Sequence, residues 1–113
     1  MKFPVTITGN DHGTYESTKM KALIWNYTMA MAKLNEAKAL NGNIDRAAHI
    51  VILAQQAIMC ALDGMDELAK AIHEYAQAFS RERLAYRFGI GETAVTNVAR
   101  IKAQRELFAQ LAK

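Results

Sequence analysis

The chain has few of the residues that cross-link or interrupt a fold. Its 113 residues include one cysteine, Cys60, and one proline, Pro4. A single cysteine excludes an intramolecular disulfide framework and is typical of a reducing compartment. Cys60 lies within the apolar run IVILAQQAIMCAL, which favours a buried, inert thiol over a nucleophile. No repeat, low-complexity tract or Pro/Gly linker divides the sequence, so we expect a single domain over residues 1–113.

The motifs of catalysis are also missing. The three histidines, His12, His49 and His73, show no HExxH, CxxC or paired metal-ligand spacing. The only dense glycines, GIG, fit a turn better than a phosphate loop. A cluster of carboxylates is explained by the dipole of a helix N-terminus and comprises Asp63, Asp66, Glu67 and Glu74. We therefore expect no enzyme, no catalytic residue, no metal and no cofactor.

Long hydrophobic runs are absent too. The most apolar stretch, residues 47–62, has 16 residues and is interrupted by His49, Gln55 and Gln56. It falls short of the roughly 20 residues that span a bilayer, so it predicts a core helix. The N-terminal sequence MKFPVTIT turns polar too early for a secretory signal. These features predict a cytoplasmic protein without a membrane partner.

The hydrophobic periodicity predicts an all-α fold of about five helices. The segments KFPVTIT and TYEST, separated by the turn residues GNDHG, are typical of a short N-terminal β hairpin or arm. A long helix capped by Ser17 or Thr18 then reaches about Asn41, with an apolar stripe through Leu23, Tyr27 and Leu34. A second helix is expected over residues 44–62, capped by Asn43 or Asp45, and a third over residues 65–79. Two more would occupy residues 80–112.

The segment from residue 80 to residue 107, SRERLAYRFGIGETAVTNVARIKAQREL, carries the strongest functional signal. Gly89 suits a turn with positive φ, and Ala85 is small where two helices would cross closely. The remaining apolar positions would share one small core: Leu84, Phe88, Ile90, Val95 and Val98. This pattern resembles the helix-turn-helix of bacterial and phage DNA-binding regulators. The resemblance implies two short helices that cross at about 90 to 120°.

The same resemblance assigns the candidate site residues. If Val95 and Val98 are buried, the opposite face of the last helix would read bases in the major groove through Thr93, Thr96, Asn97 and Arg100. Glu92 would complement the dipole at the start of that helix. Contacts to DNA phosphates would come from the preceding helix, through Ser80, Arg81, Arg83, Tyr86 and Arg87.

The distribution of charge supports a basic partner-binding region. Residues 80–113 hold seven basic and three acidic side chains, whereas the rest of the chain holds seven basic and eight acidic ones. The net charge of +3 therefore arises entirely in the C-terminal third. A nucleic-acid-binding surface requires such an excess.

Three functions follow as hypotheses. The first is a sequence-specific regulator that binds double-stranded DNA, with residues 1–79 as a helical core and dimerisation region and residues 80–113 as the helix-turn-helix region. Because the first two helices are apolar on several faces, a homodimer is one way to cover them, and packing within the chain is the other. The second is a protein-binding factor, associated with RNA polymerase or encoded by a phage as an inhibitor of a host complex. The third is a structural or adaptor domain without nucleic acid.

Overall fold

A computed structural model describes residues 12–112 of the chain, and its side chains from residue 19 onward. These residues form four α-helices with no strand among them: α1 (His12–Leu40), α2 (Ile44–Ala61), α3 (Asp66–Phe88) and α4 (Thr93–Leu111). The all-α class is confirmed, whereas five helices and an N-terminal hairpin are not. The segment TYEST lies inside α1, and its expected partner strand KFPVTIT lies outside the described residues.

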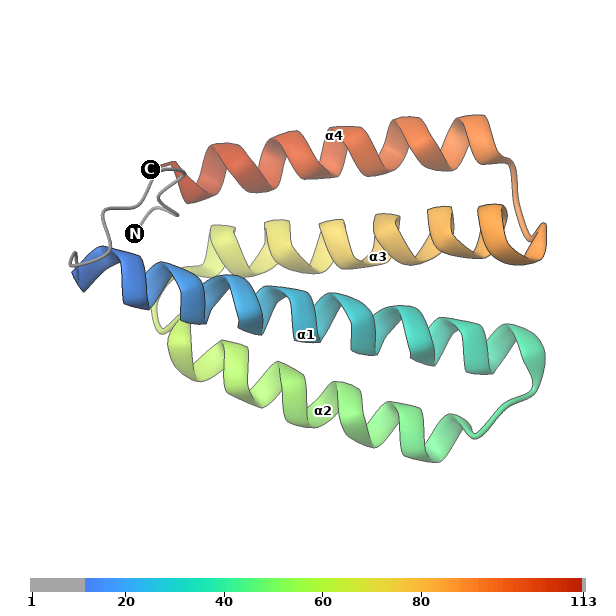
Figure 1. The fold of residues 1–113 in the computed structure, drawn as a ribbon, viewed down its shortest axis with the longest axis horizontal. Coiled ribbons are helices and arrows are strands. Elements are labelled where there is room, and N and C mark those ends of the chain that lie inside the picture. Colours follow the sequence, from blue (N-terminus) through green and yellow to red (C-terminus); the bar gives the residue numbers. More distant parts are fainter. Residues whose placement is uncertain (1–11, 113) are drawn as a thin grey trace.

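The helices form a row in the order α4, α3, α1, α2 (Figure 1). The principal packing is of α1 on α2, α1 on α3 and α3 on α4. Because α2 and α4 stand at the two edges of the row, each has one main neighbour. The inner pair, α1 and α3, therefore supplies most of the buried core.

The core is a set of apolar side chains drawn from all four helices. In the apolar stripe that the sequence predicts for the first helix, Tyr27 is almost completely buried, and Leu23 and Leu34 pack partly buried against the core. Trp25 on the same helix is half exposed. The larger side chains of the core are Met20, Ile24, Tyr27, Met31, Val51, Ile58, Leu62, Leu68, Ile72, Leu107 and Leu111.

Three local features end or begin helices where the sequence predicts them. Asn41 takes a left-handed conformation at φ 56° directly after α1, which asparagine tolerates better than most residues. The side chain of Asn43 accepts a hydrogen bond from the Arg46 amide at 3.0 Å and caps α2. Gly89 adopts φ 68° after α3, and its amide donates to the Ala85 carbonyl at 3.1 Å. The expected roles of Asn43 and Gly89 are confirmed.

The predicted boundary between a third and a fourth helix near Ser80 is wrong. A single helix, α3, runs through this position for 23 residues. No glycine or proline lies between Asp66 and Phe88, so nothing in the backbone interrupts the helix. Ser80 is 1% exposed, and its hydroxyl accepts a hydrogen bond from the Asn35 amide at 2.7 Å. Ser80, which the sequence predicted at the start of a helix, therefore links α3 to α1 through this hydrogen bond.

The arrangement of α3 and α4 also differs from the one that the resemblance implies. The two helices have 23 and 19 residues and run antiparallel beside each other (Figure 1). Their connection, residues 89–92, is short because Gly89 and Gly91 both take positive φ angles. The C-terminal part of the chain thus forms a helical hairpin in which the two helices pack along their length.

The expected small core of this segment is not formed. Val95 and Val98 are 60% and 66% exposed, and Phe88 and Ile90 are 40% and 41% exposed. Of the positions expected to be buried here, Ala85 is buried and Leu84 is half-buried. The face of α4 that meets α3 is consequently the face that the sequence analysis assigned to DNA.

A test of the central helix pair uses Ala76 of α3, which is completely buried. Ala76→Leu adds three carbons to a filled core, so we expect the free energy of unfolding to fall by about 1 to 3 kcal/mol. Ala109→Leu on the exposed side of α4 is the matched control, with an expected change within about 0.5 kcal/mol. Urea denaturation followed by circular dichroism measures both. Equal effects of the two substitutions would contradict this packing.

Candidate functional site

Two of the four predicted base-reading residues of α4, Asn97 and Arg100, lie at the seam with α3. The carboxylate of Glu82 accepts hydrogen bonds from the Asn97 amide at 2.8 Å and from Arg100 Nε at 3.0 Å. A second guanidinium nitrogen of Arg100 donates to Gln104 Oε1 at 2.6 Å. Glu82 on α3 therefore holds two residues of α4 in a half-buried polar cluster, and Asn97 and Arg100 face this cluster.

The two threonines differ from this pair. Thr96 is half-buried, and its hydroxyl donates to the backbone carbonyls of Glu92 and Thr93, which closes the first turn of α4. Thr93 is exposed. Glu92 occupies the N-cap position, although its side chain makes no capping hydrogen bond. The four predicted readers thus do not form one exposed surface.

The predicted phosphate contacts also divide into two groups. Arg81, Tyr86 and Arg87 are exposed on α3. Ser80 and Arg83 instead face α1, and we correct their assignment to a solvent-facing phosphate surface. Arg83 Nε lies 3.2 Å from the Glu36 carboxylate, a charge contact whose geometry does not make an Nε–H hydrogen bond. Both residues tie α3 to α1 because their side chains point into the bundle.

Three exposed cations line a groove formed by α3 and α4. This shallow groove of about 820 Å³ is lined by Arg81 of α3 and by Lys102 and Arg105 of α4. Glu74 and Glu106 line the same groove and offset part of this charge. This groove retains the basic character that the composition of residues 80–113 predicts.

A second groove, which the sequence did not reveal, runs between α1 and α2. It has a volume of about 460 Å³, and Lys33 is the one charged residue among the described residues that line it. Trp25 and Leu53 are each 52% exposed, and Ile50 is 43% exposed. The full lining consists of Leu23, Trp25, Asn26, Met29, Ala30, Lys33, Ile50, Leu53, Ala54 and Ala57.

Helix α2 also exposes apolar side chains outside this groove. Val51 and Ile58 face α1 and are buried, whereas Ile52 and Met59 lie on another side of the helix and are at least half exposed. Cys60 is exposed as well, so the expectation of a buried thiol is wrong. The amphipathic pattern that predicted a core helix is correct for one face only, since α2 sits at the edge of the row.

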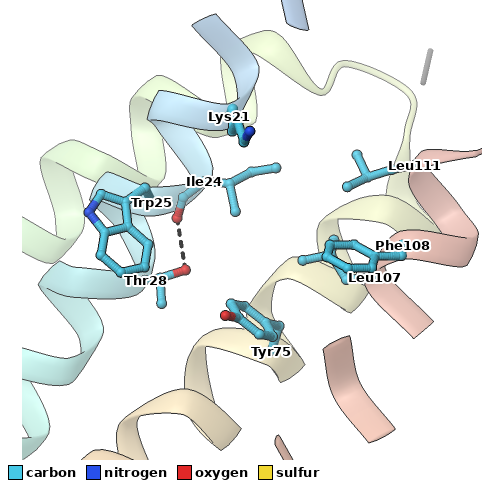
Figure 2. A pocket seen from close by; sticks show the side chains of 8 residues that line it. All are labelled: Lys21, Ile24, Trp25, Thr28, Tyr75, Leu107, Phe108 and Leu111. Carbon is cyan, nitrogen blue, oxygen red and sulfur yellow. Dashed lines mark hydrogen bonds between the residues drawn. The ribbon is translucent and has the colours of Figure 1, made fainter. Parts of the chain in front are cut away.

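The third feature is a cavity of about 250 Å³ between α1, α3 and α4 (Figure 2). Its wall is apolar and aromatic, with Lys21 at one end and Tyr75 at the other (Figure 2). Burial raises the pKa of Tyr75, and the charge of Glu82 adds to this effect while that of Arg100 opposes it. The phenol therefore remains neutral at physiological pH.

Within the described part of the chain, no group of three or more His, Cys, Asp or Glu residues is placed to hold a metal ion. None of the described helices combines the length and apolar character needed to cross a membrane. Comparison with protein-family models, with curated proteins and with solved structures finds no match. The function must therefore be inferred from the surfaces themselves.

The contact of Glu82 with Arg100 can be tested as a structural link. Their side chains are 16% and 25% exposed, so the pair is only partly screened by solvent. A double-mutant cycle with Glu82→Gln and Arg100→Gln should give a coupling energy of about 1 kcal/mol in urea denaturation. A control cycle pairs Glu82→Gln with Lys102→Gln, which lies on the exposed side of α4, and should give none. No coupling in the first cycle would contradict the structural role of Arg100.

Tyr27 provides a test of the core electrostatics. Its hydroxyl lies 2.7 Å from His73 Nδ1, and burial raises its pKa above the usual value of 10.0. The folded state therefore favours the protonated phenol, whose stabilising contribution is complete below pH 10 and is lost as the pH rises through the folded-state pKa. Tyr27→Phe should unfold more easily at neutral pH by about 1 kcal/mol and should lose less stability between about pH 9 and 11. Urea denaturation across that range would refute the assignment if both proteins lost stability equally.

Proposed function

We propose that this chain is a protein-binding helical module whose contact surface is the groove between α1 and α2. The observation that carries the proposal is the exposure of α2, which packs on one helix and still presents Ile50, Ile52 and Leu53 to solvent. Full burial of such a side chain stabilises by roughly 1.5 to 3 kcal/mol. An edge helix with this composition gains most from a partner that covers it.

The groove suits an amphipathic helix with an acidic flank. It lies between two parallel walls, α1 and α2, and helices dock into such grooves through apolar anchors spaced along one face. Trp25 and Met29, one turn apart on α1, line one wall, while Ile50 and Leu53 line the other. Trp25 is the chain's one tryptophan, and tryptophan is among the residues that most often dominate binding energy.

The charges at the groove set the sign of the partner. Lys33 lines it, and none of the described residues of its lining is a carboxylate. Arg46 is exposed on the same flank of α2, one turn before Ile50. Both cations are available to pair with acidic residues beside the partner's apolar face. These two cations favour a protein partner with acidic residues and disfavour a partner with a basic surface.

Double-stranded DNA is the second candidate, on the strength of Arg81, Lys102 and Arg105 along the α3–α4 groove. In this alternative, the chain is a DNA-binding regulator that contacts phosphates through these cations. Base reading by Asn97 and Arg100 would require both residues to leave Glu82, which costs the hydrogen bonds that they make there. The protein-binding proposal needs no such rearrangement.

Site-specific photo-crosslinking in the native cell distinguishes the candidates. A photoreactive residue at Leu53 should give a discrete protein adduct, because this position lines the α1–α2 groove. The same residue at Lys102 is the matched control and should give none. An adduct of twice the chain's mass at Leu53 would identify a second copy, as the homodimer hypothesis requires. DNA adducts at Lys102 without a protein adduct at Leu53 would replace this proposal with the DNA-binding one.

A substitution extends the same test. Leu53→Asp should abolish the adduct formed from a photoreactive residue at Met29, on the opposite wall of the groove. Leu53 is half exposed, so the helical content of the isolated protein should be unchanged. Lys102→Asp serves as the control and should leave the adduct intact. An adduct that persists in Leu53→Asp would place the contact elsewhere.

A further inference from the structure

The cavity between α1, α3 and α4 shares Trp25 with the α1–α2 groove but is otherwise built by different residues, which are far apart in sequence. Four residues of α1 line it, together with Tyr75 of α3 and three residues near the end of α4. Figure 2 shows these side chains around a common space. The lining consists of Lys21, Ile24, Trp25, Thr28, Tyr75, Leu107, Phe108 and Leu111.

The aromatic walls of the cavity are held in place by a third ring. Phe79 packs edge-on against Trp25, with ring centroids 5.7 Å apart and an interplanar angle of 76°. The same ring lies 6.1 Å from the ring of Tyr75. Because one phenylalanine contacts both walls, their separation is set before any ligand enters.

The polar groups of the lining are few and differ in availability. The hydroxyl of Thr28 donates to the Ile24 carbonyl at 2.8 Å, so its proton is already used within α1 (Figure 2). Lys21 is exposed, and the lining that the structure describes contains no carboxylate. Lys21 is therefore the one charged residue among the described residues of the lining, which is otherwise mainly apolar and aromatic.

The volume limits the size of an occupant. Apolar cavities of about 150 Å³ accept benzene, and pockets for drug-sized molecules begin at about 300 Å³. At about 250 Å³, this cavity lies between the two. A single aromatic ring with a short side chain, or a medium-length alkyl chain, matches it.

We propose that this cavity binds a small free carboxylate, with its aromatic or alkyl body among Trp25, Tyr75 and Phe108 and its carboxylate paired with Lys21. The apolar body replaces water against the aromatic walls, and the negative charge meets the one cation of the lining. This site shares Trp25 with the proposed protein contact, but its binding can be tested on the isolated chain without a protein partner.

The test titrates the full chain with octanoate and follows the fluorescence of Trp25, the chain's one tryptophan. We expect a saturable change, and about tenfold weaker binding for octanol, which lacks the charge. Lys21→Gln should weaken octanoate binding about tenfold and leave octanol binding unchanged. Lys33→Gln, on the same helix but outside the cavity, is the matched control and should bind octanoate as the wild type does.

A second variant introduces charge repulsion at a tolerant position. Phe108 is 58% exposed, so Phe108→Glu should keep its helical content while placing a carboxylate in the lining. It should weaken octanoate binding at least tenfold, whereas Val98→Glu, exposed elsewhere on α4, should not. The proposal is overturned by equal binding of octanoate and octanol, by unchanged binding in Lys21→Gln, or by no saturable signal. It is also overturned if the fluorescence change follows protein concentration and reports a second copy in the cavity.

Discussion

The packing of α1 against α3 is the interaction on which the rest of the structure depends. These two helices occupy the middle of the row, and α2 and α4 each attach to one of them. Ala76 on α3 is completely buried at the centre of the core. The bond from Asn35 to the buried hydroxyl of Ser80 adds a polar link between the pair. Since a row has two edges, the outer helices keep apolar surface that a closed bundle would bury.

That open arrangement explains why the candidate surfaces are where they are. The α1–α2 groove exists because nothing in the described chain covers the outer flank of α2. The cavity exists because α1 and α4 approach each other across α3 without packing closely. Trp25 lines both spaces, so a molecule bound in one of them would change the surroundings of this side chain in the other.

The elements of the fold were largely predictable, because their ends depend on local chemistry. Asn43 caps α2 and Gly89 ends α3 for reasons that involve only neighbouring residues. The continuation of α3 through Ser80 was harder to predict from the sequence, since serine is common both at helix starts and in buried polar contacts. The site was predicted less well. Val95 and Val98 suggested one buried face of α4, but Glu82 engages Asn97 and Arg100 on the other face.

The sequence by itself determined the helical class, most helix ends and the concentration of positive charge after residue 80. These properties follow from backbone preferences and from composition, which require no knowledge of distant neighbours. The tertiary structure alone decided how α4 is rotated, which arginines face solvent and which side chains enclose the cavity. Each of these depends on partners many residues away. Glu82 and Arg100 are 18 residues apart, and Lys21 and Leu111 line one cavity because α1 begins at the end of the bundle where α4 finishes (Figure 1). Apolar periodicity reveals that a helix has a face to bury, but the neighbouring helix decides which face that is.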